Sequence, residues 1–109
     1  MYSQGDIIAI DFPFTDGEGR KVRPALIISN NLISSTGDVI VVAITSRNSL
    51  PDFLLEIDNA LLSQPLPKQS FIRFHRLHTL HTSLIQHKVS VASPKLLDMV
   101  RDKIMSVIS

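Results

Sequence analysis

Arginine and hydroxyl side chains stand at the expected ends of two strands, where they could hold a phosphate. Arg23 lies between a glycine-containing stretch and an apolar run, and Thr45-Ser46-Arg47 directly follows the most apolar run of the chain. Arginine presents a planar fork of N–H donors that matches phosphate oxygens, and rigid strands commonly carry site residues at their ends. A structural role fits as well, with Arg23 in a surface ion pair and Thr45 satisfying backbone groups of a turn. Residue types and spacing leave both interpretations open.

Charge is distributed unevenly along the chain. Residues 1–58 hold eight acidic and four basic residues, whereas residues 59–97 hold five lysines and arginines, all four histidines and no acid. A basic segment of this kind favours a polyanion such as a nucleic acid, although a solvated basic surface has the same composition. The near-neutral total, a formal net charge of +1, conceals this segment.

Several other chemistries lack the residues that they need. The chain has no cysteine, which excludes disulfides, thiol catalysis and thiolate zinc sites. His75, His78 and His81 are spaced by three, so on a strand His78 points away from the other two, and no carboxylate is near in the sequence. No Gly-x-Ser-x-Gly, phosphate-loop or dinucleotide-binding motif is present. We therefore expect no metal and no cofactor.

Six short strands followed by one helix are the elements expected to position these residues. The helix begins at the cap Ser93-Pro94, and its apolar residues recur every three or four positions to the C-terminus. A short helical turn capped by Asp58 and an irregular connection through Pro65 and Pro67 are also expected. The expected strands are 6–12, 24–29, 39–44, 53–57, 70–80 (as one or two strands) and 87–91.

Alternation along 70–80 assigns its side chains to two faces. Arg73 and His75 would share one face with Leu77, Thr79 and His81, while Phe74, Arg76, His78 and Leu80 would occupy the other. The strands lack long helical connections, so a mainly β fold closed as a small, mostly antiparallel barrel is predicted. With 109 residues, 44% of them hydrophobic, the chain suits one domain, 1–109.

Neither a membrane span nor a signal peptide is expected. The longest apolar run, 39–44, is far shorter than the roughly 20 residues that cross a bilayer. The first six residues lack the basic start and apolar stretch of a secretion signal. A cytoplasmic protein is therefore expected.

Four segments, in order and at matching spacing, resemble the MazF/PemK toxin family over nearly the whole chain. They are Gly5-Asp6-Ile7-Ile8-Ala9-Ile10-Asp11-Phe12, Arg23-Pro24-Ala25-Leu26-Ile27-Ile28-Ser29, Ala43-Ile44-Thr45-Ser46 and the stretch 70–80, which ends in a Thr-Leu step. The resemblance implies an SH3-like β-barrel, related to that of the gyrase inhibitor CcdB, which forms a homodimer. It further implies a toxin that a cognate antitoxin neutralises. Such a toxin cleaves single-stranded RNA without metal, through the ribose 2′-OH, and leaves a cyclic phosphate and a free 5′-OH.

The resemblance also implies roles for individual residues. Arg23 and Thr45 match the family's arginine and threonine and would clamp the phosphate. Arg73 and His75 match an Arg-x-Asp pair that carries acid and base roles, with histidine here in place of aspartate. Histidine titrates near pH 6.5, so His75 would serve as the general base and Arg73 as the acid or the donor to the phosphorane.

Further basic and polar residues are candidates for RNA binding, and two alternatives to catalysis stay open. Arg20 and Lys21 of the first loop, where some family members carry a histidine, would grip the RNA backbone. One alternative is a non-catalytic binding module on the same barrel, holding RNA or a protein; another is a structural or regulatory protein with a degenerate site. The RNA-binding candidates are Arg20, Lys21, Ser46, Arg47 and Arg76.

Overall fold

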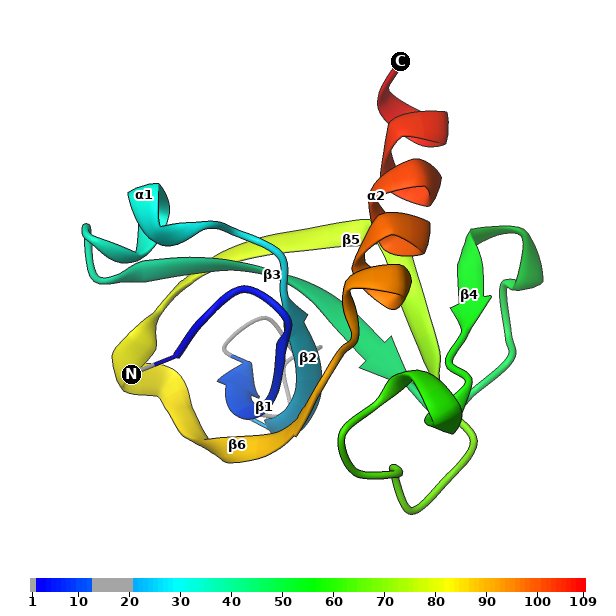
Figure 1. Cartoon of the computed structure of the whole chain (residues 1–109), viewed down its shortest axis with the longest axis horizontal. Coiled ribbons are helices and arrows are strands. Elements are labelled where there is room, and N and C mark those ends of the chain that lie inside the picture. The colour runs from blue at the N-terminus through cyan, green and yellow to red at the C-terminus, as the bar shows by residue number, and fades with distance from the viewer. Residues whose placement is uncertain (1, 13–20) are drawn as a thin grey trace.

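Six antiparallel strands form one strongly curved sheet, and a long C-terminal helix packs against its outer side (Figure 1). This computed structural model describes residues 2–12 and 21–109. The strand order is β4-β5-β3-β2-β1-β6. The strands are β1 (Asp6–Phe12), β2 (Lys21–Ile27), β3 (Asp38–Thr45), β4 (Leu54–Glu56), β5 (Phe71–His81) and β6 (Ile85–Val91). The helices are α1 (Asn31–Ser34) and α2 (Pro94–Ile108), with 3₁₀ turns η1 (Pro51–Phe53), η2 (Asn59–Leu61) and η3 (Thr82–Leu84).

The central strands are apolar at consecutive positions because both faces of the sheet are covered. Ile7, Leu26 and Val42 belong to one buried cluster, which also holds residues of α2, while their chain neighbours belong to a second cluster inside the curve. Successive side chains on a strand point to opposite faces, so an unbroken apolar run can fill both clusters.

Helix α2 begins and packs as the sequence predicts. The Ser93 side chain accepts a hydrogen bond from the Leu96 N–H at 3.3 Å, and Pro94 occupies the first helical position. Leu96, Val100 and Ile104 are buried against the sheet at a spacing of four. The last turn differs from the prediction, because Val107 and Ile108 are exposed.

A bulge in β5 changes which of its side chains share a face. Val42 of β3 pairs with Leu77, but Ile44, two residues further along β3, pairs with Ile72, five residues away along β5. The extra residues of β5 lie between these two pairings, so the strict alternation predicted for 70–80 fails there. Bulges re-aim side chains in this way and are frequent next to active sites.

The prediction of a mainly β fold with a C-terminal helix is confirmed, but among residues 2–12 and 21–109 strand pairing does not close the sheet into a barrel. The strand β4 has three residues and pairs only with β5, so within the described residues it leaves an open edge toward β6. The segment that follows η2 lies beside the end of β6. A β-bridge joins Leu62 to Ala92, and the Ser63 N–H donates to the Val91 carbonyl at 2.9 Å. Pro65 and Pro67 follow, and proline lacks the N–H that a longer ladder would need.

Several boundaries differ from those predicted, for local reasons. The expected strand 53–57 begins as the 3₁₀ turn η1 at Pro51, and the turn-rich segment 30–37 contains α1, capped by Asn30. The turn capped by Asp58 is confirmed, and of the one or two strands predicted over 70–80 the structure has one, β5. Within the described ranges, no helix combines the length and the apolar character that a membrane span requires.

Candidate functional site

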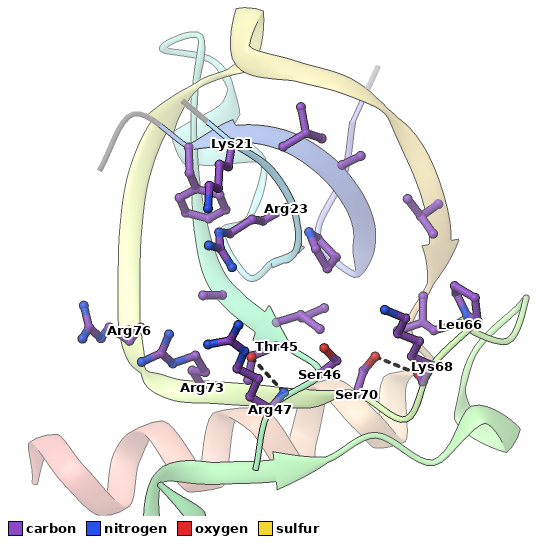
Figure 2. A pocket seen from close by; sticks show the side chains of 18 of the residues that line it. Lys21, Arg23, Thr45, Ser46, Arg47, Leu66, Lys68, Ser70, Arg73 and Arg76 are labelled. Atoms are coloured by element: carbon purple, nitrogen blue, oxygen red, sulfur yellow. Dashed lines mark hydrogen bonds between the residues drawn. The ribbon is translucent and has the colours of Figure 1, made fainter. Parts of the chain in front are cut away.

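A groove of about 1060 Å³ opens between β2, the end of β3, β5 and the segment before β5 (Figure 2). Its described walls carry no aspartate or glutamate, so they are positively charged. The positive potential of such a surface attracts a polyanion and disfavours a cationic ligand. The cationic side chains that line it are Lys21, Arg23, Arg47, Lys68, Arg73 and Arg76.

Strand pairing explains why Arg23 and Thr45 enter the same groove. Hydrogen-bonded pairing of β2 with β3 starts at Ala25 opposite Ala43, and Arg23 and Thr45 stand two residues outside this pair on their own strands. Residues two apart on a strand share a face, so both side chains point to the side that Ala25 and Ala43 share. In Figure 2, Arg23 reaches into the groove from one wall, and Thr45 lies on the facing wall.

The Thr45 hydroxyl accepts a hydrogen bond within a turn, and its own O–H remains able to donate. The backbone N–H of Arg47 donates to Thr45 Oγ1 at 3.1 Å, which turns the chain at the end of β3. A hydroxyl has two acceptor lone pairs and one O–H donor, so this contact leaves the O–H able to donate to a bound oxyanion. The structural and the phosphate-binding interpretations of Thr45 are therefore compatible.

Three guanidinium groups lie close together in the groove. Burial, together with the positive charges of Arg76 and Arg23 beside it, lowers the pKa of Arg73. Like charges held together in a partly buried wall repel one another, and a bound phosphate would relieve that repulsion. An anion bound near Arg73 would therefore be favoured electrostatically.

The structure separates His75 from Arg73, with which it was predicted to share a face, and from the groove that holds Arg23 and Thr45. Because of the bulge, Arg73, Arg76 and His78 all line the groove, whereas His75 does not. The ring of His75 lies against Phe53 of η1, with centroids 4.6 Å apart. Its Nδ1 is buried and has no hydrogen-bond partner in the described part of the chain.

His78 takes a place in the groove that the sequence did not predict. Its ring meets Phe12 of β1 edge-on, with centroids 5.3 Å apart and planes at 80°. Burial, followed by the positive charges of Arg76 and Arg73, lowers the pKa of His78. No sequence signal marked the bulge that turns His78 and Arg73 to one side.

The remaining candidates fall into two groups. Lys21, Ser46, Arg47 and Arg76, which are candidates for RNA binding, line the groove, whereas Arg20 lies outside the described residues. Lys68 and Ser70 also line it, and the Ser70 hydroxyl donates to the Lys68 carbonyl at 2.9 Å. The absence of acid from 59–97 was the only sequence signal for Lys68. Among the residues described, no cluster of three metal-ligating side chains was found.

The sequence matches a family model over residues 3–108. That model describes PemK-like, MazF-like toxins of type II toxin–antitoxin systems. The chain belongs to this family. The resemblance noted in the sequence is thereby confirmed over almost its full length. A search of curated proteins gave no match.

Solved structures of MazF proteins share the fold. A mycobacterial endoribonuclease in complex with its cognate antitoxin superposes with a TM-score of 0.79 at 17% identity, covering 99% of this chain and 95% of that one. MazF from Deinococcus radiodurans gives 0.78 at 21% identity, covering 98% and 96%. The toxin MazF-mt6 of Mycobacterium tuberculosis gives 0.74 at 14% identity, covering 94% and 95%. The curved sheet with its C-terminal helix is therefore the fold of MazF.

Proposed function

We propose that this MazF-like protein is a metal-independent endoribonuclease toxin that cuts single-stranded RNA at selected sequences. The observation that carries the proposal is the convergence of Arg23, Thr45 and Arg73, from three different strands, on one groove whose described walls carry no acidic side chain. The family is one of toxins, and two of the structures that share the fold are endoribonucleases.

In the proposed reaction, the chain cleaves through the ribose 2′-OH. The 2′-oxygen loses its proton to a base and bonds to phosphorus, and the P–O5′ bond breaks as O5′ takes a proton from an acid. The products are a 2′,3′-cyclic phosphate and a 5′-OH. Negative charge grows on the non-bridging oxygens, where donors already in place lower the barrier.

The residues of the groove supply most of these roles. Arg23 and the Thr45 hydroxyl hold the non-bridging oxygens. Arg73 donates to the phosphorane and protonates the leaving O5′, for which its lowered pKa is favourable. The family resemblance gives the base role to His75, which the described groove wall does not include.

The partners proposed for the protein follow from the same groove. Single-stranded RNA is the substrate, because its unpaired bases are free to contact side chains while its phosphates meet the basic wall. A cognate antitoxin would neutralise the toxin in the cytoplasm, as implied by the family. The exposed apolar residues near the C-terminus, Met105, Val107 and Ile108, offer contact area for a homodimer or for that antitoxin.

Incubation of long single-stranded RNA with the purified protein in EDTA tests the proposal, with Arg23→Ala as the comparison. We expect discrete cuts with cyclic-phosphate and 5′-OH ends, and a rate about 100-fold or more lower in the variant, as for loss of one oxyanion donor. Lys95→Ala, an exposed change on α2 away from the groove, is the matched control. RNA that stays bound but intact would instead show a binding module on the same fold.

A further inference from the structure

The described wall of the groove contains one imidazole, the side-chain type whose ordinary pKa of about 6.5 lies near neutral pH. Its other ionisable groups are lysines and arginines, which are protonated at pH 7 and cannot accept a proton from a ribose hydroxyl without a large pKa shift. Cleavage through the 2′-OH needs a base. His78 of β5 is the one ionisable side chain of the described groove wall that is neither lysine nor arginine.

We propose that His78 is the general base of this toxin, in the role that the family resemblance assigned to His75. The inference rests on the proposed ribonuclease function and deepens it. The bulge of β5 carries the argument, because it places Arg73 and His78 on one wall and leaves His75 beside Phe53. An imidazole is thereby presented to the same groove as the phosphate-binding arginines.

The surroundings of His78 suit a base. The Phe12 ring packs edge-on against the imidazole. The charged groups that line the same groove are Arg73 and Arg76 from β5, Lys21 and Arg23 from β2, Arg47 after β3 and Lys68 before β5. The residue paired with His78 on β3 is the apolar Val41. Positive neighbours and partial burial favour the neutral imidazole, and only that form can take a proton.

The proton balance of the step is complete. A neutral imidazole nitrogen of His78 takes the 2′-OH proton as the O2′–P bond forms. Arg73 gives a proton to O5′ as the P–O5′ bond breaks. The imidazolium then loses its proton to water and Arg73 regains one, so the groove returns to its starting state.

The test measures single-turnover cleavage against pH for the wild type, His78→Gln and His87→Gln. His87 is an exposed histidine on β6 outside the groove wall, so its variant is the matched control. We expect His78→Gln to cleave about 100-fold or more slowly, within the range of general base catalysis, and to lose the acidic limb of the pH–rate profile. Binding of an RNA with a 2′-deoxy substitution at the cut, which cannot react, should change less than about threefold.

A substrate with sulfur in place of O5′ separates base from acid, because the better leaving group needs no proton. His78→Gln should stay slow on it, whereas a variant lacking the acid should recover. The assignment would be overturned if His78→Gln kept the acidic limb of the pH–rate profile. It would also be overturned if His75→Gln lost that limb while His78→Gln kept it. The assignment would likewise be overturned if the loss of RNA affinity in His78→Gln accounted for its whole loss of cleavage rate. If the wild type itself leaves RNA intact, it is the proposed ribonuclease function that fails.

Discussion

The rings of Phe53 and His75 lie with centroids 4.6 Å apart and planes inclined at 38°, outside the basic groove. Phe53 belongs to η1 and is itself 40% exposed, so its contact with His75 lies near the surface. Three residues further along β5, His78 meets Phe12 within the groove. The two histidines are thus held by two different aromatic partners.

Removing the Phe53 ring should raise the pKa of His75. Burial is the largest cause of its lowered pKa, ahead of the charges of Arg76 and Arg73. Phe53→Ala exposes the imidazole and removes part of that cause, so NMR titration should give a higher pKa, closer to the ordinary value of about 6.5. Phe53→Leu keeps much of the cover and should give a smaller rise. Equal pKa values in Phe53→Ala and the wild type would mean that Phe53 does not shield the imidazole.

The cations of the groove should set the salt dependence of RNA binding. Arg47 and Lys68 line the groove from the end of β3 and from the segment before β5. The double variant Arg47→Ala/Lys68→Ala should bind single-stranded RNA more weakly, and the slope of log K against log salt should fall by about 0.7 for each phosphate that these cations no longer neutralise. Binding is measured with a non-cleavable RNA, and Lys95→Ala on α2 is the control. A slope equal to that of the control would exclude contact between these two cations and the RNA backbone.

Much of the fold could be predicted because local signals and tertiary structure agree. The cap at Ser93, the spacing of Leu96, Val100 and Ile104, and the apolar run 39–44 each led to an element found in the structure. Residue types and spacing placed Arg23 and Thr45 at strand ends but left their roles open, and only the family resemblance assigned them a joint one. Their convergence on one groove follows from the pairing of β2 with β3, which the sequence does not specify.

The bulge and the open edge could not be predicted, because neither is a local property. Alternation along 70–80 is equally compatible with a regular strand, so it grouped Arg73 with His75 instead of with Arg76 and His78. The irregularity appears only where β5 must pair with both halves of β3. Closure of the barrel likewise depends on how β6 pairs with the segment that contains Pro65 and Pro67, and strand propensities give no information on that pairing.

Stability should fall as the pH is lowered through the range of these histidines. The pKa values of His75 and His78 are lowered in the folded state, while the unfolded chain titrates near 6.5. Below about pH 6.5 the unfolded state therefore binds more protons, and the free energy of unfolding falls until the pH passes the folded-state pKa values. Urea unfolding at about pH 7.5 and about pH 5.5 measures the difference. We expect the double variant His75→Gln/His78→Gln to show a smaller difference, and an identical one would assign the pH dependence to other groups.

Helix α2 should contribute to stability without contributing to the chemistry. Leu96 is fully buried between α2 and the sheet, and it lies outside the groove wall. Leu96→Ala removes that packing and leaves a cavity, so the free energy of unfolding should drop by about 2–5 kcal/mol. Met99 on the same helix is 36% exposed, and Met99→Ala should cost less. Chemical denaturation measures both variants, and single-turnover cleavage is measured where each is folded. A folded Leu96→Ala protein that cleaves far more slowly than Met99→Ala would show that packing of α2 also positions the groove.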